Sequence, residues 1–234
     1  VGFIITQMEN SKALEIERET IQSRNVELQK KEQYLKAING FVTALLEEDT
    51  IFDISWEIAE NVIEKFGYQD CVIYIMNKES GCLEQIAAYG SKQDKGRRVV
   101  DPVNLELGRG IVGSVAQTGK AEIISDTSKD KRYLIDDAVR LSEVTVPIIS
   151  DGEVLGVIDS EHPEKNFFTD EHLETLTTIA NLASNRLKNA ISKKQQLQAE
   201  SELKDSERKL RNIIDSAIDG VVTIDRNGVV TEWN

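Results

Sequence analysis

The stretch LGRGIVGSVAQTGKAEIISD, residues 107–126, determines which fold the sequence predicts. Its G-x-G-x-x-G pattern and its Gly-Lys pair also occur where enzymes bind the phosphates of nucleotides. However, the strand expected at residues 103–107 alternates polar and apolar side chains, whereas the parallel strand of a dinucleotide-binding fold is apolar throughout. A helix between Gly110 and Gly119 is too short for a parallel crossover, and Ala121 stands where a P-loop has Ser or Thr. The pattern therefore indicates a glycine turn into one short helix, whose free N–H groups attract anions.

Charge and composition restrict the class of protein. The chain has 234 residues, with 28 Lys and Arg against 41 Asp and Glu, and its net charge is −13. Because nucleic acids and anionic membranes attract clustered positive charge, neither is expected as the main partner. Two cysteines, Cys71 and Cys82, are too few for a disulfide framework and indicate a reducing cytoplasm. No apolar run reaches the roughly 18 residues of a membrane span, so no membrane insertion is expected. The chain begins at Val1 without Met, so we expect a piece of a longer protein.

Glycine and proline are concentrated in the middle of the chain, where they favour turns. All three prolines and ten of the fourteen glycines lie between Gly67 and Pro163. The sequence therefore predicts a long helix, a turn-rich α/β region, a second long helix that begins at Thr169, and a short tail. Within the α/β region we expect a helix at residues 50–66 and strands at residues 71–76, 83–88, 103–107, 121–124, 144–149 and 154–159.

Two short sequences indicate hairpins. Asp151-Gly152 lies between two of the expected strands and predicts an antiparallel pair. In the tail, Asn227-Gly228 predicts a type I′ turn between strands at residues 221–224 and 229–232. Pro147 cannot donate a ladder hydrogen bond, so it predicts an edge position or a bulge. The expected fold is α/β (α+β), with a central antiparallel sheet.

The first long helix carries an apolar residue at every seventh position, which is the pattern of a coiled-coil seam. The second seam position is mostly polar in either register, so the sequence predicts only a weak coiled coil. Packing of this helix along its own domain is the alternative. Apolar residues continue in the C-terminal helix, and we expect a parallel homodimer. The expected interface residues are Leu14, Ile21, Leu28, Leu35, Val42, Leu187, Ile191 and Leu197.

The glycine turn is followed by LSEVTVPIISDGEVLGVIDSEHPEKNFFTDEHLETLTTIANLAS, residues 141–184. The order of glycine turn, short helix, strand and Asp, then VP, GEVLGVI and F-x-D-E, resembles a GAF domain, the small-molecule-binding sensor module of signalling proteins. Arrays of this kind are similar to bacterial sensor histidine kinases and also occur with cyclase outputs. The resemblance implies a signalling helix at residues 1–34, a GAF-like domain at residues 35–190, a linker helix at residues 191–210 and the incomplete start of a PAS-like domain at residues 211–234.

The resemblance implies a sheet with the long helices on one face and a ligand pocket on the other. The matching positions combine helix N–H groups for an anion, hydroxyls and carboxylates for hydrogen bonds, and an aromatic ring for stacking. They are Gly110, Ile111, Val112, Asp126, Thr127, Tyr133, Thr145, Val157 and Asp159. The ligand is expected to be small and polar, and neither its identity nor a cofactor is implied.

Departures from better-defined GAF sites narrow the chemistry. His162-Pro163 stands where cyclic-nucleotide-binding relatives carry Asn-Lys, which disfavours that ligand. Bilin-binding relatives need an attachment cysteine beside a histidine, and neither Cys71 nor Cys82 has one. His172 lacks the neighbours of a phosphoacceptor histidine and is expected on a helix surface. The sequence shows no catalytic nucleophile with a base beside it and no metal ligand set.

The resemblance therefore implies a cytoplasmic sensory module that is not itself an enzyme. It would bind a small molecule and signal through dimeric helices to a downstream output domain in the same chain, such as a histidine kinase. A ligand-free dimerisation spacer is one alternative, and the regulatory GAF domain of a nucleotide cyclase is another.

Overall fold

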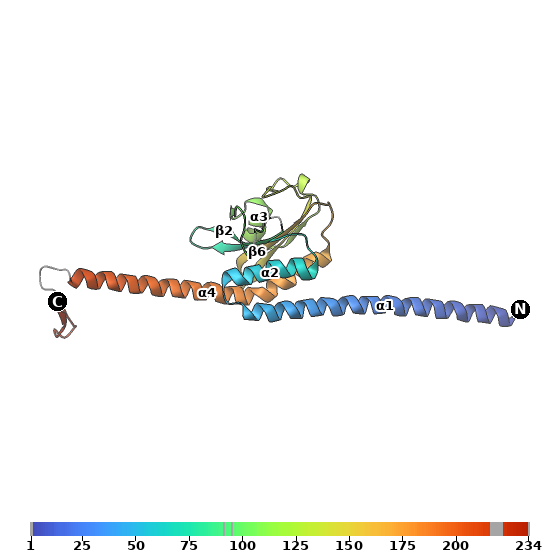
Figure 1. The fold of residues 1–234 in the computed structure, drawn as a ribbon, viewed down its shortest axis with the longest axis horizontal. Coiled ribbons are helices and arrows are strands. Elements are labelled where there is room, and N and C mark those ends of the chain that lie inside the picture. The colour runs from blue at the N-terminus through green and yellow to red at the C-terminus, as the bar shows by residue number, and fades with distance from the viewer. Residues whose placement is uncertain (1, 91, 95, 216–221, 234) are drawn as a thin grey trace. The chain divides into compact units, whose positions relative to one another are not determined.

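The computed structural model describes residues 2–90, 92–94, 96–215 and 222–233 (Figure 1). Its elements are α1 (Gly2–Glu47), α2 (Ile51–Phe66), β1 (Cys71–Asn77), β2 (Cys82–Tyr89), β3 (Asn104–Glu106), α3 (Gly110–Thr118), β4 (Glu122–Ile124), η1 (Thr127–Lys129), β5 (Ser142–Ser150), β6 (Glu153–His162), α4 (Asp170–Asp215), β7 (Val222–Ile224) and β8 (Val230–Trp233). They form two compact units, residues 1–188 and 189–234, and α4 contributes residues to both.

Strands β1 to β6 form one six-stranded sheet in the first unit. The strand order is β3-β2-β1-β6-β5-β4, and all neighbouring strands are antiparallel. In the central pair, Gly156 of β6 lies opposite Ile75 of β1, and a Cβ on it would come within 2.2 Å of the Tyr74 carbonyl oxygen. Glycine therefore allows the two strands to approach. The prediction of an antiparallel sheet is confirmed, and a parallel nucleotide-binding fold is excluded.

One face of the sheet is covered by α2 (Figure 1). The helix begins after Thr50, whose hydroxyl accepts the Asp53 N–H at 3.0 Å, and it ends at Gly67, whose φ of 76° forms a left-handed C-cap. Its apolar side packs on β1 and β2, because its hydrophobic residues recur at helical spacing. The fully buried residues of this helix and of the two central strands include Ile54, Ile58, Val62, Ile73 and Ile158.

The opposite face carries the short helix α3 over β5 and β6 (Figure 1). Gly108 and Gly110 have φ values of 80° and 74°, which side chains disfavour, so the turn into α3 requires glycine. Gly113 lies so close to β3 that a Cβ would come within 2.5 Å of the Glu106 carbonyl oxygen. The predicted strand, glycine turn and short helix are thereby confirmed. The core between α3 and the sheet contains Val72, Tyr74, Leu83, Ala88, Leu105, Val112, Val115, Ala116 and Val157.

The β5–β6 hairpin is confirmed in its position and in its turn. Asp151 and Gly152 have φ values of 51° and 79°, as a type I′ turn requires at both central positions. Pro147 lies beyond Thr145, the last β5 residue that pairs with β4, and it immediately precedes Ile148, after which the β5–β6 register shifts. Pro147 therefore occupies a locally unpaired edge next to a bulge, as a residue without an N–H must.

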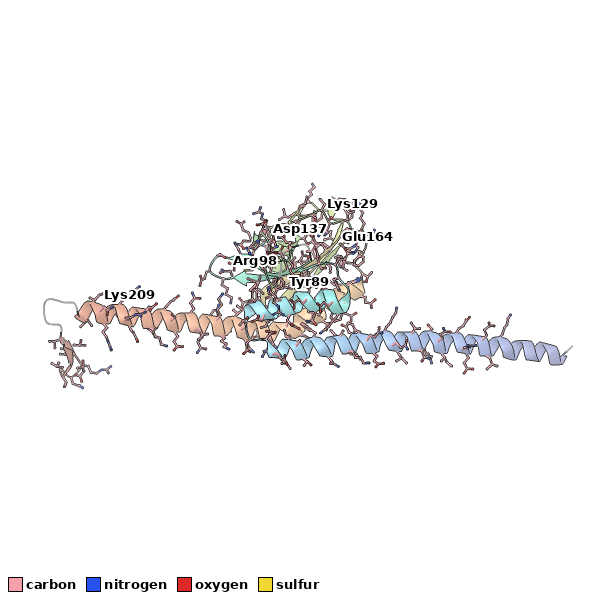
Figure 2. The ribbon with its side chains drawn as sticks, in the orientation of Figure 1. Tyr89, Arg98, Lys129, Asp137, Glu164 and Lys209 are labelled. Atoms are coloured by element: carbon pink, nitrogen blue, oxygen red, sulfur yellow. The ribbon has the colours of Figure 1, made fainter. Side chains whose placement is uncertain are left out.

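Helix α1 has a long exposed part and a short buried end. Its last turns pack beside α2, where Phe41 and Leu45 are buried and Val42 is half-buried. Along most of its length, the side chains stand free of the rest of the first unit (Figure 2). The remaining heptad residues are between 50% and 66% exposed, and the homodimer that would cover them stays a prediction. They are Leu14, Ile21, Leu28 and Leu35.

The second unit contains the rest of α4 and the β7–β8 hairpin. The type I′ prediction for its turn is wrong, because of the described non-glycine residues only Asp101, Asp151 and Asn166 have positive φ. Asn227 therefore cannot occupy a type I′ position. Instead, the Gly228 N–H donates to the Asp225 carbonyl at 3.0 Å, and the Asp225 carboxylate accepts the N–H groups of Asn227 and Val229. The capping carboxylate selects a turn with a glycine bulge. Val221, expected to begin the first strand, lies outside the described residues.

An aromatic cluster connects the end of β6 to the start of α4. The ring of His162 is buried and stacks on Phe167, with ring centres 3.5 Å apart. His172 packs edge-on against Tyr68, and its Nδ1 accepts the Thr169 N–H at 3.1 Å. Thr169 therefore precedes α4 as predicted, with His172 as its capping partner. His172 lies half-buried in the first turn of α4, where its ring closes the cap and packs on the aromatic cluster.

Candidate ligand-binding site

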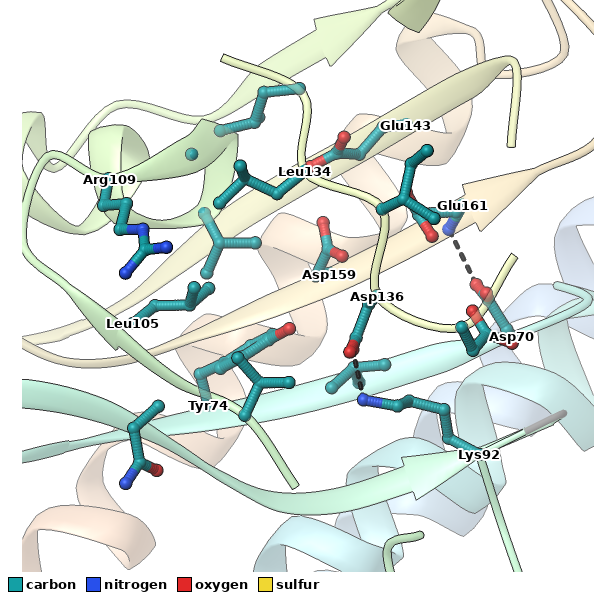
Figure 3. A pocket seen from close by; sticks show the side chains of 18 of the residues that line it. Asp70, Tyr74, Lys92, Leu105, Arg109, Leu134, Asp136, Glu143, Asp159 and Glu161 are labelled. Atoms are coloured by element: carbon teal, nitrogen blue, oxygen red, sulfur yellow. Dashed lines mark hydrogen bonds and ion pairs between the residues drawn. The ribbon is translucent and has the colours of Figure 1, made fainter. Parts of the chain in front are cut away.

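A cavity of about 230 Å³ lies on the α3 face of the sheet (Figure 3). Strands β1 and β6 form its floor, the start of α3 forms one end, and residues 134–137 cover it. Its volume is below the roughly 300–1,000 Å³ of pockets for drug-sized ligands, so it suits a small molecule. The apolar lining residues are Val72, Val103, Leu105, Ile111, Val112, Leu134 and Ile135. The polar and charged ones are Asp70, Tyr74, Tyr89, Lys92, Asn104, Arg109, Asp136, Asp137, Glu143, Asp159 and Glu161.

The segment of residues 130–141, called the strap below, connects η1 to β5 and covers the cavity. Its carboxylate Asp136 accepts a hydrogen bond from the Gln85 amide at 2.6 Å and forms an ion pair with Lys92 (Figure 3). Lys92 is only 7% exposed, and its ammonium also donates to the Gln85 carbonyl oxygen at 2.9 Å. A buried charge is stable only when it is paired and hydrogen-bonded. These contacts therefore hold the strap against β2 and the loop that follows it.

The C-terminal end of the strap is held by Arg140. Its backbone N–H donates to the Tyr133 hydroxyl at 2.9 Å, and its carbonyl accepts the Thr127 hydroxyl at 2.5 Å. The guanidinium lies 3.3 Å from the Asp137 carboxylate and 3.9 Å from that of Asp70, which precedes β1. The strap is thus fixed at two places by charged groups, and between them it lies over the cavity.

Three carboxyls of β5 and β6 meet on the floor and wall of the cavity. Glu143 lies opposite Glu161, and Thr145 lies opposite Asp159, so side-chain alternation places all four on one face of the sheet. The Thr145 hydroxyl is 2.7 Å from an Asp159 oxygen and 3.1 Å from a Glu143 oxygen. A hydroxyl has one hydrogen, so it can donate to only one of these carboxyls at a time.

Burial dominates the protonation of these carboxyls. It raises the pKa of Glu143 to about 8 and that of Glu161 to about 9, with repulsion from neighbouring carboxylates as the second cause. Burial, together with the Glu143 charge, also raises the pKa of Asp159 far above its ordinary value. For Asp70, burial raises the pKa only to about 6. The rise is smaller because the Glu161 N–H at 2.7 Å and the Arg140 guanidinium partly stabilise the Asp70 charge. At neutral pH the cluster therefore holds protons, since close carboxyls cannot all ionise without a cation.

The nine predicted ligand residues have different positions relative to the cavity. Gly110, Ile111, Val112 and Asp159 line it directly. Behind this lining, the Thr145 hydroxyl lies 2.7 Å from Asp159, Val157 is buried in the core under α3, and the Tyr133 hydroxyl accepts the Arg140 N–H of the strap. Away from it, the Asp126 carboxylate pairs with Lys165 at 2.9 Å, and the Thr127 side chain is bonded to the strap.

Sequence reasoning missed several lining residues. Glu143 and Glu161 each lie two positions along the strand from a residue that was selected, Thr145 and Asp159. The period of two along a strand could have found both, because residues two apart share a face. Lys92 and the lining residues of the strap lie in irregular segments, so no periodic pattern in the sequence predicts that they line the cavity.

No group of three or more His, Cys, Asp or Glu side chains among the described residues is arranged to hold a metal ion. None of the helices in the described part of the chain combines the length and apolar character needed to cross a membrane.

Comparison with known proteins gives relatives that share this region. The chain is 33% identical over 99 residues to protein YtsP of Bacillus subtilis, a match that covers 39% of this chain and 61% of the relative. It is 35% identical over 79 residues to the free methionine-R-sulfoxide reductase of Saccharomyces cerevisiae, which covers 33% of this chain and 44% of the relative. The chain therefore spans less than two thirds of the length of either relative.

Solved structures share the fold at lower identity. The GAF domain of an Acinetobacter phosphoenolpyruvate-protein phosphotransferase has a TM-score of 0.61 at 21% identity, over 68% of this chain and 94% of that one. The free methionine-R-sulfoxide reductase of Neisseria meningitidis, solved with its substrate, has a TM-score of 0.59 at 19% identity, over 68% and 90%. Residues 53–187, more than half of the chain, match the GAF domain family. The fold agrees with this match, and the chain belongs to the GAF domain family.

Proposed function

We propose that the chain is the cytoplasmic sensory module of a signal-transduction protein. The cavity under the strap binds a small polar molecule, and α1 and α4 pass the resulting change to an output domain in the same protein, such as a histidine kinase. The observation that carries this proposal is the cavity itself, which is closed by a segment fixed through the buried Lys92–Asp136 ion pair. A cavity that only filled space would not need buried charges in its cover.

The proposed ligand contacts follow from the positions of the nine residues. Gly110, Ile111, Val112 and Asp159 contact the ligand directly. Thr145 acts through the carboxyls it hydrogen-bonds, Tyr133 acts by holding the strap at Arg140, and Val157 supports the cavity from below. Asp126 and Thr127 position the start and end of the strap.

Within the first unit, one side chain connects the two long helices. Arg186 of α4 donates to the Leu46 carbonyl oxygen at 2.8 Å and also to the Glu48 carbonyl oxygen. Both carbonyls lie at the C-terminal end of α1, where carbonyl groups have no partner within the helix and a positive charge is favourable. A displacement of either helix would strain these hydrogen bonds, and this coupling supports a relay through α1 and α4.

We further propose that this relay acts in a parallel homodimer, formed through α1 and the C-terminal part of α4. Leu187 is fully buried in its own chain, whereas Ile191 is half-buried and Leu197 is exposed, so the last two remain for the interface. Burial of each leucine contributes roughly 2 kcal/mol, and polar seam residues offset part of it. Such a weak seam can change its packing.

The dimer is tested with the double variant Ile21→Asp and Leu28→Asp. It adds two negative charges to the seam in either register, so sedimentation should show a monomer. The control Ser23→Asp with Lys30→Gln changes the net charge by the same amount on the outer face of the helix, and it should remain dimeric. A seam variant as dimeric as the parent would remove α1 from the interface.

Ligand binding is tested by native mass spectrometry of the purified protein and by thermal-shift screening of small polar molecules. A retained mass or a rise in melting temperature that is lost in Asp159→Asn supports the sensor. Without either, the module is a dimerisation spacer. The reductase activity of the yeast and Neisseria relatives is not proposed for this chain. Reduction of a sulfoxide needs a two-electron donor, and neither Cys71 nor Cys82 lines the cavity.

A further inference from the structure

A short segment after β2, called the connector below, contacts both the strap and α2. Its described residues are 92–94 and 96–100. The Val100 N–H donates to the Lys92 carbonyl oxygen at 2.9 Å. The Asp94 N–H donates to the Arg98 carbonyl oxygen at 3.1 Å. These backbone hydrogen bonds join the two arms of the connector, so a displacement of one arm is passed to the other.

One end of the connector is bound to the strap. The Lys92 ammonium forms the ion pair with Asp136 of the strap and also donates to the Gln85 carbonyl oxygen at 2.9 Å (Figure 3). Lys92 is 7% exposed, so without Asp136 its charge would be buried without compensation. A buried lysine that loses its partner has to release its proton or move into water. A displacement of the strap therefore changes the charge or the position of this end of the connector.

The other end of the connector is bound to α2 through Arg97. Its Nε and Nη2 donate to the two carboxylate oxygens of Glu60, at 3.2 and 2.9 Å. The guanidinium also lies 3.6 Å from a carboxylate oxygen of Asp53 and from one of Glu57. A bidentate pair fixes the direction of the arginine as well as its distance. Arg97 therefore attaches the connector to three carboxylates of one helix.

These three carboxylates, called the acidic row below, lie on one face of α2. Asp53, Glu57 and Glu60 are four and three positions apart, a spacing at which like charges on a helix repel one another. Arg97 compensates this repulsion. Only residues 48–50 separate the end of α1 from the start of α2, and the two helices contact each other. Release of Arg97 therefore destabilises the start of α2, beside the end of α1.

We propose that the connector transmits the position of the strap to the start of α2 and to α1. The proposal rests on the proposed sensory function and adds the contacts by which the cover of the cavity reaches a signalling helix. In the closed state, the Lys92–Asp136 pair and the Arg97 contacts are both formed. When the strap is displaced, the connector shifts, Arg97 leaves the acidic row, and the start of α2 opens more often. The Arg186 contacts then carry the change from the end of α1 to α4.

Hydrogen exchange of the full chain tests the connector without a ligand. Asp136→Asn removes the charge that holds Lys92, so exchange of residues 54–60 should become at least about threefold faster. In the Arg97→Gln background, the same substitution should change this exchange by less than about 1.5-fold, because the connector no longer holds α2. Arg98→Gln is the matched control, since it removes the same charge from an exposed side chain of the connector. In that background, the effect of Asp136→Asn should persist.

Two further measurements apply even if Asp136→Asn does not fold, which circular dichroism checks. Coupling between two sites is reciprocal, so Arg97→Gln should accelerate exchange of residues 134–137 in the strap, whereas Arg98→Gln should not. The Arg97 side chain is 33% exposed, so its contacts are screened by salt. In about 1 M KCl the difference between Arg97→Gln and the parent should therefore shrink. Exchange of β1 and β6 in each variant gives the reference for global stability.

The outcomes separate the connector from the sensor. Unchanged exchange of residues 54–60 in Asp136→Asn, or equal acceleration with and without Arg97, would overturn the connector. If Asp136→Asn does not fold, unchanged strap exchange in Arg97→Gln overturns it instead. Because the coupling is measured without a ligand, these outcomes leave the sensor proposal in place. Absence of a retained molecule in native mass spectrometry and of any thermal shift overturns the sensor, whatever the exchange shows.

Discussion

Strands β5 and β6 have two faces that differ in chemistry. On the face toward α2, the apolar side chains of Val144, Val146 and Ile158 are at most 1% exposed. On the face toward α3, the same strands bury carboxyls, of which Glu143 is 3% and Asp159 6% exposed. Burial of a carboxyl without a counter-charge is unfavourable, whereas burial of an isoleucine is favourable. The helix face therefore stabilises the fold, and the cavity face carries groups that stability alone would not select.

The largest effect should come from the helix face. Ile158→Ala removes a fully buried side chain from the central strand, opposite Ile73. The free energy of unfolding should fall by about 2–5 kcal/mol, because transfer energy is lost and a cavity remains. Chemical denaturation measures it. The matched control Val139→Ala removes an exposed apolar side chain of the strap and should change stability by less than about 0.5 kcal/mol. An Ile158→Ala protein as stable as the parent would contradict the division between the two faces.

The next effect is the pH dependence that the cavity face produces. The folded pKa values of Glu143 and Glu161 are raised to about 8 and about 9 by burial, so the folded state binds more protons than the unfolded state below these values. Stability should therefore fall as the pH rises, by about 4 kcal/mol between about pH 6.5 and about pH 8.5. His172 does not produce this slope. Burial lowers its folded pKa, so its effect on stability appears only as the pH falls below this window. Melting temperatures across the window measure the slope.

The variant Glu161→Gln identifies the source of that slope. The amide cannot ionise, so the fall in unfolding free energy between about pH 6.5 and about pH 8.5 should be smaller by about 2 kcal/mol in this variant. Asp126→Asn is the control, since its carboxylate has a lowered pKa through Ser128 and Lys165 and does not titrate in this window. An unchanged slope in Glu161→Gln would mean that the cavity carboxyls do not determine the pH dependence.

The sequence predicted the helix face well because its rules are local. The apolar period of α2 predicts the helix that covers this face, and Asp151-Gly152 predicts the hairpin of β5 and β6. The turn at Asn227-Gly228 was mispredicted because one side chain, Asp225, replaced the usual dipeptide preference. A local rule fails where a neighbouring side chain supplies a competing hydrogen bond.

The cavity face was only partly predictable. Asp159 and the start of α3 follow from the family pattern, and Glu161 follows from strand alternation. Lys92 and Asp136 are 44 positions apart and meet only because the strap folds back over β2. Contacts between irregular segments depend on the tertiary fold and leave no period in the sequence.

A polar contact on the helix side offers a smaller test of the comparison. Arg186 pairs with the carbonyls at the end of α1, and its buried Nε has no hydrogen-bond partner among the described residues. Arg186→Met keeps the aliphatic volume but leaves those carbonyls unpaired, so the free energy of unfolding should fall by about 1 kcal/mol. Hydrogen exchange should increase in the last turns of α1, whereas Arg208→Met, on the exposed part of α4, should leave both unchanged. Unchanged exchange in Arg186→Met would separate the two long helices and weaken the proposed relay.

The smallest change in stability is expected in the β5–β6 turn, which belongs to neither face of the sheet. Asp151 forms an ion pair with Lys188 of α4, but its side chain is 78% exposed. Water screens such a pair, and asparagine adopts the positive φ of this position as readily as aspartate does. Asp151→Asn should therefore change the free energy of unfolding by less than about 0.5 kcal/mol and leave its slope with pH above about 6.5 intact. Asp151→Val should be clearly less stable, because a β-branched side chain disfavours a positive φ. If Asp151→Asn lowered the free energy of unfolding as much as Asp151→Val, the charge rather than the backbone conformation would stabilise the turn. Exposed ion pairs would then contribute to stability beside the buried apolar contacts of the helix face.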